Sequence, residues 1–215
     1  MALALFDLDN TLLNGDSDHA WGLYLAQIGA LDPIVQKERQ DFFYQQYVDG
    51  ELDIYEFCEY QFEVLRTTPR ATLEKWRREY TQEVIEPMIA SGKANLLEPH
   101  RQRGDTLIII TATNDFITAP IAERLGVKNL IATRAEQKNG YFTGKVGGTP
   151  CFQEGKVARL NEWIEKHGGS MQDSIFYSDS YNDLPLLKVA STAIAVTPDD
   201  KLRAHAHKFH WQIID

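Results

Sequence analysis

The segment that most constrains the fold of this chain lies near its start, at residues 4–13, which read ALFDLDNTLL. Its first three residues are apolar, as in a strand that is buried inside a sheet. Asp7, Asp9 and Thr11 follow at once. A strand of this kind brings two carboxylates and a hydroxyl to one edge of a sheet. We therefore expect the rest of the chain to complete, cover or support that edge.

Composition and charge restrict the class of protein. The chain has 215 residues, of which 43% are hydrophobic and 25% charged, enough for one α/β domain with a sizeable insertion or for two small domains. The formal net charge of −9 argues against a nucleic-acid partner, which needs clustered lysine and arginine. No signal peptide, membrane span or basic amphipathic segment is recognisable, and only two cysteines are present. We expect a cytoplasmic protein with no membrane partner.

Residues 15–88 are expected to form an all-helical insertion. Asp16 and its neighbours are N-cap candidates for a first helix, and Asp32-Pro33 is typical of the start of a second. A third helix has apolar residues at amphipathic spacing, and Thr68-Pro69 precedes a fourth. None of these segments alternates as a strand would. We therefore predict a core made of residues 1–14 and 89–215.

Strands and helices alternate in the remainder of the chain. We expect strands near residues 106–110, 129–132, 174–177, 192–196 and 209–213, with helices between them and a β-hairpin within residues 134–150. Such alternation predicts a doubly wound parallel sheet, an α/β fold. Ligands of these sheets bind beyond the carboxyl ends of the strands.

Residues with chemical function follow three of the expected strands. They are Asp7 and Asp9 after the first, Thr111 after the second, Asp179 with Asp183 after the strand at 174–177, and Lys156 at the start of the preceding helix. Converging carboxylates repel one another unless a cation lies among them, and oxygen ligands favour a hard ion such as Mg²⁺. The metal and the lysine can neutralise phosphoryl oxygens, and Thr111 can donate a hydrogen bond. The set therefore indicates a phosphoryl site.

The two aspartates of the first strand can have different roles. Asp7 can attack phosphorus, because a carboxylate is a competent nucleophile toward phosphoryl groups. Asp9 is two residues further on and lies on the same side of an extended chain. It can protonate the leaving alcohol and then deprotonate water. Each residue alone also fits a turn, a helix cap or a solvated side chain, so it is the ordered combination that points to this chemistry.

In these motifs the sequence resembles the haloacid dehalogenase-like superfamily of phosphatases. The first motif matches residues 7–11, the second Thr111, the third Lys156 and the fourth residues 178–183, so the resemblance spans the chain. The long insertion resembles the helical cap of the phosphoserine phosphatase-like branch, and we call residues 15–88 the cap. One departure is that Ser178 and Ser180 stand where glycines are common.

The resemblance implies a Rossmann-like core and a set of residue roles. Asp7 would be the nucleophile and Asp9 the general acid and base, while Thr111 and Lys156 would bind phosphate. Mg²⁺ would be held by Asp7, the main-chain carbonyl of Asp9, and Asp179, with Asp183 in support. The family also implies a small phosphate ester as the partner and a cap that closes over it.

The substrate is expected to be selected by the cap. In phosphoserine phosphatases an acidic residue nine positions after the nucleophile holds the substrate ammonium, and Asp16 has that spacing here. Their arginine for the substrate carboxylate has no counterpart at residues 49–56. Residues 15–90 carry 15 acidic and 7 basic side chains. A solvated face also explains much of this excess of acidic residues. An anionic patch in addition repels a carboxylate and favours a substrate that has an amine and no carboxylate.

Residues 14–21 resemble the histidinol-phosphatase-like group of this branch. Histidinol phosphate has an ammonium and an imidazole and lacks a carboxylate. Asp16 and Asp18 would contact its cation and Trp21 would stack on its ring, although simple helix capping also explains the two aspartates. Alternatives are phosphoserine, phosphoethanolamine or phosphocholine as the substrate. A phosphotransferase that uses an alcohol in place of water, or a non-catalytic phosphate-binding protein, would be a different class.

Overall fold

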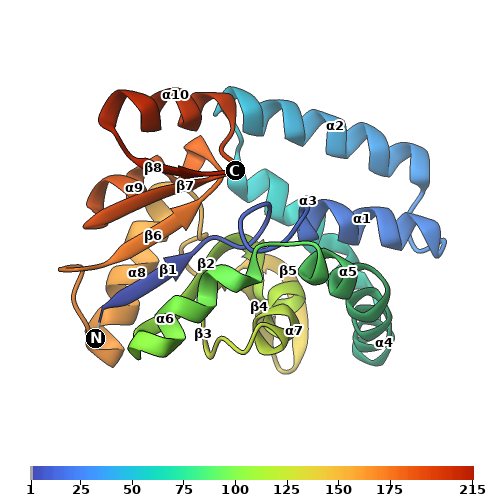
Figure 1. Ribbon diagram of the computed structural model, residues 1–215. Helices are drawn as coiled ribbons and strands as arrows, with labels where there is room; N and C mark the ends of the chain where they lie inside the picture. The colour runs from blue at the N-terminus through green and yellow to red at the C-terminus, as the bar shows by residue number, and fades with distance from the viewer. Residues whose placement is uncertain (1) are drawn as a thin grey trace.

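A six-stranded sheet forms the centre of the molecule, in the strand order β3-β2-β1-β6-β7-β8 (Figure 1). The computed structural model describes residues 2–215. All neighbouring strands of this sheet pair in parallel. The strands are β1 (Leu3–Phe6), β2 (Thr106–Asn114), β3 (Asn129–Thr133), β6 (Ile175–Ser178), β7 (Thr192–Val196) and β8 (Gln212–Ile214). The predicted doubly wound parallel sheet is thereby confirmed, and the order reverses at β1, where ligands of such sheets bind.

Both faces of the sheet are buried, and the alternation along β1 shows how. Ala4 and Phe6 belong to one hydrophobic cluster, whereas Leu3 and Leu5 belong to the other. Successive side chains of a strand point to opposite faces, so a strand covered on both faces is apolar throughout. The helices of the core are α6 (Glu98–Arg103), α7 (Asp115–Arg124), α8 (Glu154–His167), α9 (Leu184–Val189) and α10 (Asp200–Phe209).

Residues 15–90 form helices joined by short turns, with no strand among them, as predicted for the insertion. It consists of α1 (Ser17–Gln27), α2 (Pro33–Asp49), α3 (Ile54–Thr67), α4 (Arg70–Tyr80), a π-helical turn (Thr81–Ile85) and α5 (Glu86–Ala90). The side chains of Asp16, Asp32 and Asp53 accept hydrogen bonds from the first backbone amides of α1, α2 and α3. Because these amides have no partner within a helix, capping aspartates fix where each helix begins.

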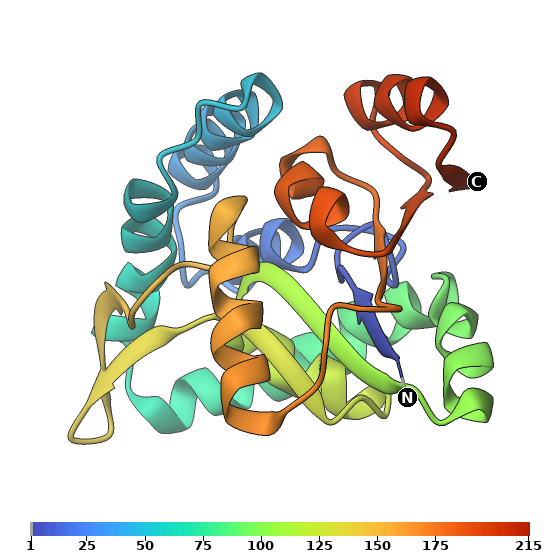
Figure 2. The ribbon, with the colours of Figure 1, turned by 90° about the vertical axis from the view of Figure 1, so that its left-hand side faces the viewer.

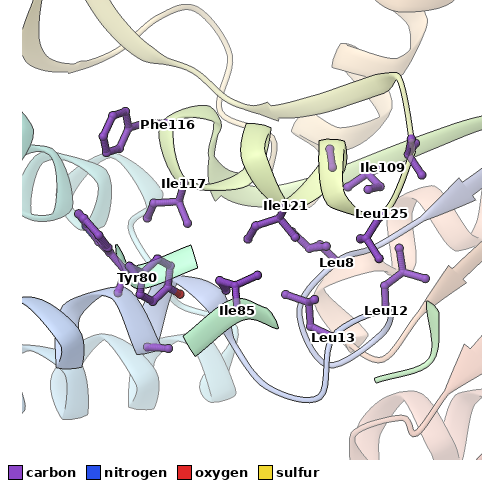
Figure 3. Packing of buried hydrophobic residues seen from close by; sticks show 14 of the residues in the cluster. Leu8, Leu12, Leu13, Tyr80, Ile85, Ile109, Phe116, Ile117, Ile121 and Leu125 are labelled. Carbon is purple, nitrogen blue, oxygen red and sulfur yellow. The ribbon is translucent and has the colours of Figure 1, made fainter. Parts of the chain in front are cut away.

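The two segments by which the chain enters and leaves the cap lie side by side. The backbone amide of Asn14 donates to the carbonyl of Met88 over 3.1 Å. A Cβ atom at Gly92 would lie only 2.2 Å from the carbonyl oxygen of Leu12, so this approach requires glycine. We place the division between core (1–14, 89–215) and cap (15–88) at this crossing. Figure 3 shows Leu8, Leu12 and Leu13 packed there on Ile85 and on residues of α7.

The expected β-hairpin is present and connects the core to the cap. It consists of β4 (Ala135–Lys138) and β5 (Tyr141–Val146), which pair antiparallel. β5 packs against α3, and the two lie side by side in Figure 2. Phe142 of β5 contacts the ring of Phe116 edge-on, with 5.4 Å between the ring centroids. The hairpin therefore supports the cap at α3, away from the segments near Asn14 and Met88 by which the chain enters and leaves the cap.

Two boundaries differ from those expected. β2 continues to Asn114, four residues beyond the apolar run, so Thr111 and Thr113 lie within the strand. α10 continues to Phe209, where His210 ends it in a left-handed conformation with φ 56°, and β8 begins only at Gln212. Across residues 2–215, no helix is at once long and apolar enough to traverse a lipid bilayer.

Candidate active site

A cavity of about 940 Å³ lies between the carboxyl ends of the strands and the helices α1, α2 and α3. Its walls come from the loops after β1 and β6, from the end of β2, from the start of α8 and from the cap. The sheet thus delivers most of the residues singled out in the sequence to one place. Those that line the cavity are Asp7, Asp9, Asp16, Asp18, Thr111, Lys156, Asp179 and Asp183.

Lys156 lies at the centre of the charged residues and is 2% exposed. Its Nζ donates to Asp7 Oδ1 over 2.7 Å, and both carboxylate oxygens of Asp183 lie 2.7 Å from it. Burial opposes the charged form, but the carboxylates of Asp183 and Asp7 outweigh it and raise the pKa of Lys156. The side chain is therefore an ammonium that holds two carboxylates together.

The backbone before Lys156 allows it to enter the site. A Cβ atom at Gly155 would lie 2.0 Å from the carbonyl oxygen of Pro150. Only glycine permits that approach in the first turn of α8, and Gln153 just before it adopts φ 48°. This backbone conformation thus places the side chain of the next residue, Lys156, beneath the strand ends.

Asp179 and Asp183 have different surroundings although both follow β6. The hydroxyl of Ser178 donates to Asp183 over 2.7 Å, so Asp183 is engaged by Ser178 and Lys156 together. Asp179 accepts from the Thr11 hydroxyl over 3.0 Å. Burial, followed by the charges of Asp7 and Asp183, raises the pKa of Asp179 well above its usual range. Asp183 supports the site, whereas Asp179 has capacity for a further ligand.

The donor atoms near Asp7 fit a hard divalent cation. Burial, with the charges of Asp183 and Asp9, raises the pKa of Asp7 to about 7 even though Lys156 lowers it. Carboxylates with too little positive charge around them call for a cation. In the part of the chain that is described, no three His, Cys, Asp or Glu side chains form a ready metal cluster. Asp7 and Asp179 offer carboxylate oxygens for such a cation, and the family resemblance implies the main-chain carbonyl of Asp9 as a third protein ligand.

Both carboxylate oxygens of Asp9 are held by neighbours. The backbone amide of Ser17 donates to Oδ1 over 2.6 Å and the hydroxyl of Thr113 to Oδ2 over 2.8 Å. Burial and the charge of Asp16 raise the pKa of Asp9 to about 6, while the two hydrogen bonds lower it. A carboxyl with a pKa near neutrality is suited to proton transfer in both directions.

Thr113 is a site residue that the sequence analysis missed. It lies two residues after Thr111 in β2, and period two places both on the same side of the strand. The hydroxyl oxygen of Thr111 accepts from the Thr113 amide over 3.2 Å, which leaves its proton free to donate into the cavity. The repeated threonine at alternate positions was the available signal for this pair.

Asp16 and Asp18 line the cap side of the cavity. Asp16 Oδ1 accepts from the amides of Asp18 and His19, so its capping role is observed as well. Asp18 is buried, and its carboxylate accepts from the side-chain amide of Gln61. Burial, then the charges of Asp16 and Asp9, raise the pKa of Asp18 well above its usual range. Among residues 2–215, Asp18 therefore forms no ion pair with a cationic side chain.

Trp21 does not lie where the sequence analysis expected it. It is 2% exposed and belongs to the hydrophobic core, where its indole packs edge-on against Tyr80 with 5.1 Å between centroids. The large apolar ring gains more from that burial than from a place beside four carboxylates. The aromatic wall of the cavity consists instead of Phe43, Tyr44, Tyr47, Phe57, Tyr60, Phe152 and Tyr181.

Comparisons with known proteins identify the family of this chain. Residues 4–188 match the model of the family described as haloacid dehalogenase-like hydrolase. The chain belongs to this family, and the predicted family is confirmed. A histidinol-phosphatase of Neisseria meningitidis is 39% identical over 217 residues, which cover 99% of this chain and 98% of that protein. A phosphoserine phosphatase of Mycobacterium tuberculosis is 31% identical, over 100% of this chain and 70% of that protein. The predicted enzyme class, a phosphatase, is thereby confirmed.

Solved structures give the same picture of the fold. A Bordetella pertussis Tohama I protein of unknown function is 41% identical and superposes with a TM-score of 0.93, over 100% of this chain and 98% of that one. A phospho-aspartyl intermediate analogue of phosphoserine phosphatase has a TM-score of 0.69 at 21% identity, over 99% and 92% of the two chains. This second likeness concerns the fold alone, and it agrees with the predicted parallel sheet with a helical cap.

Replacing Lys156 tests the arrangement of charges. Lys156→Met leaves the buried carboxylates of Asp7 and Asp183 without their cation, and we expect the free energy of unfolding to fall by about 3–5 kcal/mol. Urea unfolding at neutral pH in the presence of EDTA measures this loss without compensation by a metal. Lys145→Met, which removes an exposed ammonium of β5, is the control. Equal stability of the two variants would contradict the central role of Lys156.

Proposed function

We propose that this protein is a Mg²⁺-dependent phosphomonoesterase that works through a phospho-aspartate, with histidinol phosphate as its substrate. The observation that carries the proposal is the charge of the cavity. Asp7, Asp9 and Lys156 form a phosphoryl site on the core side, and Asp16 and Asp18 face it from the cap. No arginine is among the described residues that line the cavity.

The proposed first step is the attack of Asp7 on phosphorus. Lys156 holds Asp7 Oδ1, so Oδ2 is the atom that forms the new bond to phosphorus as the bond to the alcohol oxygen breaks. Asp9 gives its proton to that leaving oxygen. Lys156 and the hydroxyl of Thr111 hold the phosphoryl oxygens during the transfer.

The second step returns the enzyme to its starting state. A water molecule attacks the phosphorus of the phospho-aspartate, Asp9 takes the proton of that water, and the bond from phosphorus to Asp7 breaks. Inorganic phosphate leaves. The hydrogen bonds from Ser17 and Thr113 keep Asp9 in place for both proton transfers.

Asp7→Asn tests the proposed nucleophile. The amide has nearly the shape of the carboxylate but is a far weaker nucleophile, so we expect turnover to fall by at least about a thousandfold. Release of inorganic phosphate from p-nitrophenyl phosphate measures it. Unchanged turnover in the folded variant would refute the mechanism.

A bound Mg²⁺ would neutralise phosphoryl oxygens beside Asp7, held by Asp7, the main-chain carbonyl of Asp9, and Asp179. We expect EDTA to abolish phosphate release and added Mg²⁺ to restore it. Binding of Mg²⁺ followed by calorimetry is a readout that does not depend on activity, and Asp179→Asn should weaken it at least about tenfold. Full activity after exhaustive removal of divalent ions would contradict this part of the proposal.

The cap side of the cavity favours a cationic substrate. Asp18 is a buried carboxylate without a cationic partner, and a substrate ammonium beside it would supply the missing charge. The aromatic residues of α2 and α3 offer faces on which an imidazole can pack. The Neisseria relative that covers nearly the whole chain has the name histidinol-phosphatase, which supports the same choice.

Phosphoserine is the second candidate, because Asp16 has the spacing of the ammonium-binding residue and one relative is named a phosphoserine phosphatase. Its carboxylate would have to lie in a cavity that is lined by aspartates and has two lysines, Lys156 and Lys201. Lys156 binds Asp7 and Asp183 and is needed for the phosphoryl group, and Lys201 donates to the carbonyl of Val48. Amines without a carboxylate, such as phosphoethanolamine or phosphocholine, avoid this conflict.

A substrate panel tests the choice. We expect histidinol phosphate to be hydrolysed with a higher kcat/KM than phosphoserine, phosphoethanolamine or phosphocholine. Asp18→Asn removes the charge but keeps the shape, and we expect kcat/KM for histidinol phosphate to fall by about ten- to a hundredfold, the value of a hydrogen bond to a charged group. Hydrolysis of glycerol phosphate, an ester without an amine, should change far less.

Asp41→Asn is the matched control for this panel, since Asp41 is an exposed aspartate of α2 that pairs with Lys37 outside the cavity. Fast hydrolysis of phosphoserine with none of histidinol phosphate would refute the proposed substrate. An equal loss on all esters in Asp18→Asn would show that Asp18 does not select the cation.

A further inference from the structure

The carboxyl end of α2 contacts the fourth motif across the cavity. The hydroxyls of Tyr47 and Ser180 are hydrogen-bonded, with 2.6 Å between their oxygens. The side-chain amide of Asn182 donates to the carbonyl of Tyr47 over 3.2 Å. Lys201, at the start of α10, donates to the carbonyl of Val48 over 2.6 Å, and Figure 1 shows α2 ending beside α10. Three bonds therefore fasten this end of the cap to the core.

The bond between Tyr47 and Ser180 is followed by further hydrogen bonds that lead toward the proposed nucleophile. The backbone amide of Ser180 donates to the hydroxyl oxygen of Ser178 over 3.1 Å, and that hydroxyl donates to Asp183 over 2.7 Å. Asp183 and Asp7 are both bound by Lys156. A continuous series of short polar contacts thus leads from a cap hydroxyl to the nucleophile. A residue without a hydroxyl at position 178 or 180 would interrupt it.

We propose that Tyr47 is a positioning residue, whose bond to Ser180 couples docking of the cap to the alignment of Asp7 through Ser178, Asp183 and Lys156. Docking of α2 fixes the loop that follows β6, and this loop fixes the carboxylate that orients Lys156. When α2 is not docked, Ser180 loses its partner in the cap and the loop gains freedom. The inference rests on the chain being a phosphatase of its family, and it does not depend on which ester is the substrate.

The position of Tyr47 also admits a simpler role. Its ring lines the cavity and lies 6.2 Å from that of Phe152, so it could serve only as a wall for the substrate. The two roles have different kinetic consequences. A residue that only binds substrate changes KM when it is altered, whereas a residue that aligns the nucleophile changes kcat.

Tyr47→Phe separates the hydroxyl from the ring. The variant keeps the contact with Phe152 and loses the bond to Ser180, and we expect kcat to fall about five- to tenfold with KM nearly unchanged. Steady-state hydrolysis of p-nitrophenyl phosphate and of the best natural ester measures both constants. Tyr55→Phe is the control, since Tyr55 is an exposed tyrosine of α3 outside the cavity, and its kcat should equal that of the unmodified protein.

A double-mutant cycle tests the path. Ser180→Ala should lower kcat as well, and adding Tyr47→Phe to it should produce no further loss, because both changes remove the same bond. Ser180→Thr keeps a hydroxyl and should retain most of the activity. Thermal unfolding of each variant verifies that the compared proteins are folded.

Three results would overturn the inference: an unchanged kcat in Tyr47→Phe, a change confined to KM, or losses that multiply in the double variant. Failure of histidinol phosphate as a substrate is a separate result. In that case p-nitrophenyl phosphate still reports on Tyr47, while the proposed substrate alone is refuted.

Discussion

The ammonium of Lys156 among buried carboxylates is the interaction on which the site depends. Charges removed from water are tolerated only when they are paired and hydrogen-bonded. Here one lysine holds Asp7 and Asp183, which follow strands adjacent in the sheet and are 176 residues apart in the chain. The parallel sheet supplies the geometry because the carboxyl ends of neighbouring strands meet at one edge. The parallel sheet therefore determines both the fold and the position of the charged side chains in the site.

Much of this arrangement could be predicted from local sequence signals. A strand was expected near residues 106–110 and is present, and the aspartates expected at helix starts are N-caps, as at Asp16 and Asp32. These signals depend on neighbours within a few residues. The order of the motifs along the chain then predicted that the candidate site residues lie close together, because the carboxyl ends of the strands meet at one edge in any sheet of this type.

Tertiary packing determines which aromatic side chains face the cavity, and the sequence analysis could not predict this. Trp21 and the aromatic residues of α2 have similar local patterns, yet the indole is buried in the core and Tyr47 faces the cavity. An apolar helix face has the same sequence pattern whether it packs against the hydrophobic core or lines a ligand cavity. Ser178 and Ser180 looked like minor departures from a motif, and their hydroxyls instead connect α2 with Asp183. Contacts between residues over a hundred positions apart leave no local trace.

The unusual pKa values of the cavity have one cause in common, burial with too little positive charge. It raises the pKa of Asp7 and Asp179 on the core side and that of Asp18 on the cap side. A divalent cation would supply the missing positive charge beside Asp7 and Asp179, and a substrate ammonium would supply it beside Asp18. A phosphate ester that has an amine and no carboxylate complements both. The protein's own charges thus favour the proposed class of substrate.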